Sequence, residues 1–208
     1  MDSAGIDKLR QELLESIVSD AFSQGIISSE DISGKRLAEK VLELIKHAHI
    51  EVIIDHRESI LEAAIAYLKK DQPDFSLLVF ATYFEHSINY ILATALRKRK
   101  IQQKTLIEII RSLTLEAKTG WAFELLELPV INPAHRKVIL AVANERNSFV
   151  HYKWKPNPDE PTGHDKEDAR LTVLLTSARK SVTYIRMYES RYIFAKHKKA
   201  IRSAVRAP

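Results

Sequence analysis

The chain has 208 residues, an apolar fraction of 45% and a formal net charge of +5, which fits one globular domain or one domain with an appendage. It has no cysteine, which excludes disulfides, thiolate metal ligands and a cysteine nucleophile, and its 5 glycines form no glycine-rich phosphate-binding motif. No apolar run of about 18 residues and no signal-peptide pattern is present, so we expect a cytoplasmic protein without a membrane partner.

The charge is unevenly distributed along the chain. Residues 1–62 contain 7 Lys/Arg and 13 Asp/Glu, a net charge of −6, whereas residues 63–208 contain 25 and 14, a net charge of +11. This polarity favours contact between the second part and a polyanion such as RNA. The alternative is that these basic residues only solvate helix faces.

The N-terminal third is predicted to be helical. Apolar residues at helical spacing predict a first helix over residues 6–24, which Gly25 ends. A second, long helix is predicted from about 35 to 70. We therefore expect an N-terminal helical extension over residues 1–33, followed by the main helical domain over residues 34–208.

One polar stripe on the predicted helix 35–70 has metal-ligand residue types. His47, Glu51 and Asp55 recur at every fourth position and would share one helix face. Such a stripe is more often a solvated face than a metal site. The sequence therefore predicts no bound metal and no cofactor.

Further helices are predicted in the second part of the chain. Their approximate ranges are 75–99, shorter helices within 104–128 that break at Gly120, and a last helix over 166–205. The segment from Arg179 to Arg206 holds 9 Lys/Arg and one opposing carboxylate, that of Glu189, so it is a solvated arm or an added phosphate-binding surface.

Another predicted helix, starting near residue 133, carries the most informative stretch. Asn132 is a good N-cap and Pro133 suits the first helical position, while Pro156 lies just past the predicted end. Near this end the chain reads Arg146-Asn147-x-x-x-His151. Asn147 and His151 lie about 40° apart around a helix, whereas Arg146 and His151 lie about 140° apart.

This geometry points to a symmetric pair of helices. A single straight helix does not easily direct Arg146 and His151 at one small target. Two copies that meet near a two-fold axis bring a pair of each residue together. The sequence therefore predicts a homodimer.

The residue types suit one reaction class. His151 titrates near neutral pH and can move a proton, and the planar guanidinium of Arg146 suits a phosphate group. Together they suit metal-free cleavage of RNA, in which the ribose 2′-hydroxyl attacks the adjacent phosphate and Arg146 stabilises the developing charge.

The Arg146-Asn147-x-x-x-His151 run resembles the Arg-x4-His signature of the HEPN superfamily. The resemblance implies an all-α, HEPN-like helical bundle that dimerises through the motif helix. It also implies a metal-independent endoribonuclease of the toxin or phage-defence type. Arg146 and His151 would be catalytic and Asn147 would assist them.

Three supporting residues are expected, one from the resemblance and two from their position after the motif. Glu85 matches the polar or acidic residue on the second bundle helix that often faces the motif arginine, so we expect an ion pair with Arg146. Lys153 and Lys155 follow the motif and are candidates for RNA binding. One HEPN sub-group has a tyrosine two residues after the histidine, the target of a partner nucleotidyltransferase. Here Lys153 takes that place and Tyr152 is adjacent, which departs from that pattern.

Other interpretations stay open. The chain is alternatively a non-enzymatic helical module that binds nucleotide, RNA or a partner protein, as its weak resemblance to mannitol-operon-repressor-like proteins suggests. It is alternatively one subunit of a toxin–antitoxin pair whose activity a partner blocks. A HEPN-like fold can also keep the motif for structure alone.

The first testable prediction concerns the oligomeric state. The angular offset of Arg146 and His151 motivates this hypothesis: if the two residues converge only across a two-fold axis, the active species should be a dimer. Light scattering on the peak that carries ribonuclease activity should give twice the chain mass. An active monomer would contradict the composite site.

The second prediction concerns ionic strength. If Lys153 and Lys155 contact RNA phosphates, RNA affinity should fall steeply with salt, and replacing both by alanine should flatten the log–log slope by up to about 1.4. Alanine at Lys8 and Lys46, in the acidic N-terminal part, is the matched control. An unchanged slope after the first replacement would mean that the two lysines are only solvated.

Overall fold

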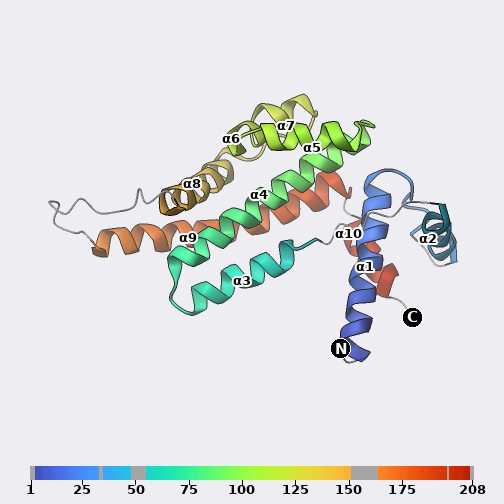
Figure 1. The fold of residues 1–208 in the computed structure, drawn as a ribbon, viewed down its shortest axis with the longest axis horizontal. Helices are drawn as coiled ribbons and strands as arrows, with labels where there is room; N and C mark the ends of the chain where they lie inside the picture. Colours follow the sequence, from blue (N-terminus) through green and yellow to red (C-terminus); the bar gives the residue numbers. More distant parts are fainter. Residues whose placement is uncertain (1–2, 33–34, 48–54, 151–163, 196, 207–208) are drawn as a thin grey trace. The chain divides into compact units, whose positions relative to one another are not determined.

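The computed structural model describes residues 3–32, 35–47, 55–150, 164–195 and 197–206. Within these ranges every regular element is a helix and no strand is present, so the predicted all-α class is confirmed (Figure 1). The elements are α1 Ser3–Ser23, α2 Lys35–His47, α3 Arg57–Lys69, α4 Pro73–Lys98, α5 Gln103–Ser112, α6 Leu115–Lys118, α7 Trp121–Leu125, α8 Pro133–Val150, α9 His164–Tyr188, a π-helical turn Glu189–Ile193, and α10 Lys198–Arg206.

The chain forms two compact units. The first combines Met1–Asp55, Ala93–Leu106 and Tyr188–Pro208, and the second combines His56–Leu92 and Ile107–Met187. Both units are therefore built from separate stretches of the chain. The predicted domain boundary after residue 33 stays a prediction.

In the first unit, α1 ends in a glycine-dependent cap. Gly25 has φ +74°, its N–H donates to the Phe22 carbonyl at 3.0 Å, and the N–H of Ile26 donates to the Ala21 carbonyl at 2.9 Å. This pair of bonds is the Schellman arrangement, which needs a residue with positive φ. The predicted stop at Gly25 is therefore confirmed.

The C-terminal helix α10 packs on α1. Ile201 is fully buried, and Nε of the adjacent Arg202 donates to Glu15 Oε1 at 2.5 Å. The basic residues of α10 therefore flank an apolar anchor. One of them already has an acidic partner within this unit.

The second unit contains four long helical segments, α3, most of α4, α8 and most of α9. Figure 1 shows that α3 and α4 run in opposite directions, as do α8 and α9. Apolar residues at helical spacing on α3, α4, α8 and α9 form the core of this unit. Fully or almost fully buried members are Leu61, Ala64, Phe80, Phe84, Ile88, Ile91, Ile139, Val142, Leu175, Ala178 and Ile185.

Contacts at the two ends of this unit set the pairing of the helices. At one end, Tyr67 stacks on Phe75, and Phe75 meets Phe149 edge-on with ring centroids 6.2 Å apart. At the other end, Glu58 of α3 forms an ion pair with Arg186 of α9. The aromatic contacts align the end of α8 with the start of α4 and the end of α3. The ion pair aligns the start of α3 with the end of α9.

The predicted long helix over residues 35–70 is wrong as a single element. The helical segment α2 ends at His47, Asp55 is not helical, and His56 is the N-cap of α3; residues 48–54 lie outside the described part. Residues 50–54 include three isoleucines and a valine, and β-branched residues have low helix propensity. Asp55 therefore leaves the predicted polar stripe, and Glu51 is among the residues not described.

The predicted last helix over 166–205 is also interrupted. It ends at Tyr188, continues as the π-helical turn, and breaks where Ala195 has φ +45° before α10 begins. The extra residue per turn of the π segment buries Ile193 and Phe194, and Lys98 Nζ donates to the Ile193 carbonyl at 3.1 Å. Tertiary packing within the first unit thus overrides the helical pattern of the sequence.

The shorter helices predicted within 104–128 are present, and Gly120 separates α6 from α7 as expected. None of the described helices combines the length and apolar character needed to cross a membrane.

Candidate functional site

The motif helix α8 begins with the predicted cap. Asn132 Oδ1 accepts a hydrogen bond from the N–H of Ala134 at 2.9 Å, and Pro133 occupies the first helical position. Tyr184 of α9 holds the same turn, because its hydroxyl accepts a hydrogen bond from the Asn132 N–H at 2.8 Å. These bonds fix the start of α8 and therefore the direction in which its other end projects.

Arg146 continues the buried face of α8. It lies seven residues after Ile139 and four after Val142, both fully buried, so the three side chains share one helix face. The Arg146 side chain is 30% exposed, as expected where the core face reaches the surface. Its charge therefore sits at the edge of the core and is not free in solvent.

Two side chains hold this guanidinium in place. Arg146 Nη1 donates to Glu85 Oε2 of α4 at 2.8 Å, and Glu85 is 38% exposed. Nε and Nη2 of the same arginine donate to Asn147 Oδ1 at 3.3 and 3.2 Å. Glu85 thus ties α8 to α4, while Asn147 restrains the arginine from the next position in the chain.

Three of the residues selected from the sequence therefore come together, namely Glu85, Arg146 and Asn147. The expected ion pair between Glu85 and Arg146 is present. The catalytic role of Arg146 and the assisting role of Asn147 stay predictions. The other three selected residues, His151, Lys153 and Lys155, lie outside the described residues.

A second ion pair braces the same part of α8. Arg170 of α9 donates from Nη1 and Nη2 to the two oxygens of Glu145, at 2.7 and 3.0 Å. A two-pronged pair of this kind fixes orientation as well as distance. The last turns of α8 are thus tied to α4 through Arg146 and to α9 through Glu145.

Lys118 is a charged residue of this region that the sequence does not reveal. It ends α6 and is only 4% exposed, which is rare for a lysine. Burial lowers the pKa of its ammonium group, and the nearby Glu85 carboxylate raises it. No sequence signal marks Lys118, because a lysine in a four-residue helix normally faces solvent.

The turn after α6 is attached to α8 by one arginine. Arg136 donates from Nε to Thr119 Oγ1 at 3.3 Å and from Nη2 to the Glu116 carbonyl at 3.2 Å. A Cβ at Gly120 would lie 3.1 Å from that carbonyl and 3.3 Å from Arg136 Nη2, so a larger residue would require these neighbours to shift by a few tenths of an ångström. These contacts hold α6, and with it Lys118, against α8.

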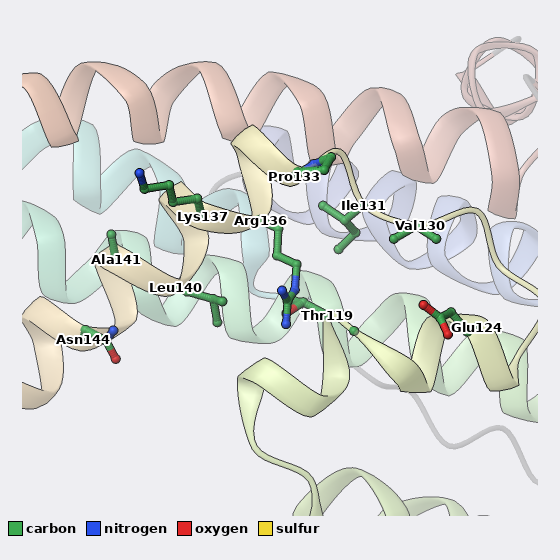
Figure 2. A pocket seen from close by; sticks show the side chains of 11 residues that line it. Thr119, Glu124, Val130, Ile131, Pro133, Arg136, Lys137, Leu140, Ala141 and Asn144 are labelled. Atoms are coloured by element: carbon green, nitrogen blue, oxygen red, sulfur yellow. The ribbon is translucent and has the colours of Figure 1, made fainter.

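A cavity of about 560 Å³ lies beside this attachment, between α8, the turn from α6 to α7 and the residues before Asn132 (Figure 2). Figure 2 shows Arg136 extending from α8 toward Thr119, with Leu140 and Ile131 at the apolar wall. Its charged lining residues are Arg136, Lys137 and Glu124. The cavity thus has an apolar wall and charges of both signs.

Two further polar residues of the second unit, His135 and Asn89, are partly buried. His135 stacks on Tyr184 with ring centroids 4.2 Å apart, its Nδ1 lies 3.0 Å from Ser181 Oγ, and burial lowers its pKa. Asn89, one turn after Glu85, has a buried Oδ1 without a hydrogen-bond partner among the described residues. Among the residues that the structure describes, no three His, Asp or Glu side chains come together as a metal site.

Comparison with known proteins identifies no relative: no family model, no curated protein and no solved structure matches the chain. The likeness to the HEPN superfamily therefore rests on the motif residues alone.

The third prediction separates stability from function at the ion pair. Because Glu85 and Arg146 are both partly exposed, their coupling should contribute only about 0.2–1 kcal/mol to the free energy of unfolding. A double-mutant cycle with Glu85→Ala and Arg146→Ala in urea should measure it. The Glu145–Arg170 pair serves as the matched control. A coupling of several kcal/mol would mean that Arg146 is mainly a structural residue.

Proposed function

We propose that the protein is a metal-independent endoribonuclease with a composite arginine–histidine site at a homodimer interface. The observation that carries the proposal is the restraint on Arg146, whose guanidinium is held by Glu85 at 2.8 Å and by Asn147 at 3.2 and 3.3 Å while the side chain remains 30% exposed. An arginine fixed in this way offers preorganised donors to a phosphate group.

The proposed chemistry divides the work between two residues. His151 takes the proton from the ribose 2′-hydroxyl as that oxygen attacks the phosphorus; the bond to the 5′-oxygen breaks, and this oxygen takes up a proton from water to leave as a hydroxyl. Arg146 stabilises the added negative charge on the phosphate oxygens. Lys153 and Lys155 bind flanking phosphates, and the basic second part of the chain favours a polyanionic substrate.

The likeness to the HEPN superfamily supports a toxin or phage-defence role, with an antitoxin as the partner class. The second candidate is a non-enzymatic helical module. It is favoured by the same ion pair, because Glu85 compensates the charge of Arg146 and the pair then serves only to join α4 and α8. The two candidates predict different results for a His151 variant. The ribonuclease would lose RNA cleavage, whereas the non-enzymatic module could change only in binding.

The fourth prediction tests the reaction. Purified protein in EDTA should cleave labelled single-stranded RNA, leave DNA of the same sequence intact, and yield 2′,3′-cyclic phosphate ends or their hydrolysed form. His151→Ala should lower the cleavage rate by about 10²–10⁴-fold, since the proton carrier is lost. Arg146→Ala should act similarly.

Two exposed residues serve as matched controls for these variants. His86→Ala removes an exposed histidine of α4, and Arg111→Ala removes an exposed arginine of α5; both should cleave as the unchanged protein does. Cleavage that EDTA abolishes and a divalent metal restores would refute the mechanism, as would equal cutting of DNA. Cleavage of neither substrate, with RNA binding retained, would favour the non-enzymatic module.

A further inference from the structure

The cavity beside the turn from α6 to α7 lies away from the proposed ribonuclease site. One face of α8 forms a wall of this cavity, through residues at helical spacing, namely Lys137, Leu140, Ala141 and Asn144 (Figure 2). Lys137 and Arg146 lie about 180° apart around a helix, so Arg146 extends from the opposite face of α8. A ligand in the cavity would therefore occupy a separate site, and its recognition does not depend on the proposed reaction.

Arg136 presents a flat guanidinium to this cavity. Its Nε and Nη2 donate along one edge, to Thr119 Oγ1 at 3.3 Å and to the Glu116 carbonyl at 3.2 Å. Because guanidinium N–H groups donate within the plane of the group, these bonds hold the plane in position without covering its faces. Gly120 has no side chain beside Nη2, where a Cβ would lie 3.3 Å away, and the Arg136 side chain is 32% exposed. The guanidinium is thus a restrained, partly exposed stacking surface.

The rest of the cavity suits a flat, largely apolar group. Leu140 and Ile131 form its apolar wall, and Val130 and Ala141 extend this wall. Its volume of about 560 Å³ falls within the range of about 300–1,000 Å³ that is typical of small-molecule sites. Nucleobases stack on arginine guanidinium planes, and a flexible alkyl chain gains nothing from such a plane. Arg136 beside an apolar wall therefore favours a heterocyclic ring as the bound group.

Charged side chains lie at opposite ends of the cavity. Figure 2 shows Lys137 at one end and Glu124 at the other, with Arg136 between them. Among the residues that the structure describes, no hydrogen bond or ion pair engages Lys137 or Glu124. Glu116 Oε1 lies 4.0 Å from Arg136 Nη2 and its side chain is 77% exposed, so it offsets the charge of the arginine only weakly. The Lys137 end therefore favours an anionic group, and the Glu124 end favours N–H donors.

We propose that this cavity is a nucleotide-binding site, in which the base stacks on the Arg136 guanidinium against the apolar wall and Lys137 binds the phosphate. Guanine suits Glu124 best, because its adjacent N1–H and N2–H groups match the two oxygens of a carboxylate. The nucleotide is free in solution or is an unpaired nucleotide of an RNA, since both present the same base and phosphate. Binding requires no cleavage, so this proposal and the ribonuclease proposal stand or fall separately.

The fifth prediction concerns the binding of guanosine 5′-monophosphate to the full chain, followed by NMR. The nucleotide should shift the signals of three groups that line the cavity, namely the backbone amide of Gly120, the Nε–H of Arg136 and the side-chain amide of Asn144. Lys137→Ala should weaken this binding by about tenfold, because the cation that faces the phosphate is lost. Guanosine, which has no phosphate, should bind equally well to Lys137→Ala and to the unchanged protein.

A second variant fills the cavity and leaves its charges in place. Ala141→Phe puts a large side chain on the α8 wall, at a position that is only partly buried, and should abolish the shifts. Ala66→Phe and Lys69→Ala are the matched controls at exposed positions of α3, and both should bind the nucleotide as the unchanged protein does. Unchanged melting temperatures would show that lost binding is not lost folding. Lys137 is exposed, so its variant tests the site even where Ala141→Phe does not fold.

A short single-stranded RNA with one guanosine among uridines distinguishes the two sources of the nucleotide. If it shifts the same signals and binds at least as tightly as the free nucleotide, RNA is the ligand; weaker binding identifies a free nucleotide. The proposal is overturned if the three signals do not shift at millimolar nucleotide, or if the Lys137→Ala variant binds as tightly as the unchanged protein. Absence of nucleotide binding would instead favour a protein partner, for which exposed Trp121 and Leu125 of α7 offer apolar contacts.

Discussion

The bond between Glu85 and Arg146 is the constraint on which the arrangement of this region depends. It joins α4 to α8 at 2.8 Å, 61 residues apart in the chain, at the level where the buried face of α8 reaches solvent. Apolar packing alone aligns two helices but tolerates rotation about their axes. The Arg146–Glu85 ion pair favours one rotation of α8 against α4, and the two-pronged Glu145–Arg170 pair favours one rotation against α9. Ion pairs thus orient the end of α8, whereas apolar packing orients the rest of the helix.

The helices of the second unit were predictable from the sequence because the one-sided apolar pattern agrees there with the residues that start and end helices. Asn132 and Pro133 mark the start of α8, and the buried phenylalanines of α4 recur at helical spacing. The helix breaks were not predictable where the apolar pattern continues but the backbone does not stay α-helical. Apolar periodicity continued past Asp55, which is not helical, and through the π-helical turn after Tyr188, where the chain departs from the α-helix. Periodicity reports which face is apolar; it does not report whether the backbone stays helical.

The same distinction applies to the site. Arg146 and its partner Glu85 were predictable because a short motif and one acidic residue on a neighbouring helix face carried a signal. Lys118 carried none, since its burial depends on how α6 lies against α8, where Arg136 donates to the Glu116 carbonyl. Burial of a charged residue follows from the tertiary arrangement of several elements. The sequence of a four-residue helix alone does not show such burial.

Stability gives little reason for the charged residues at this edge of the core. A partly exposed ion pair such as Glu85–Arg146 contributes about 0.2–1 kcal/mol, and burial of the Lys118 ammonium group costs free energy. An apolar side chain at position 118 would avoid that cost.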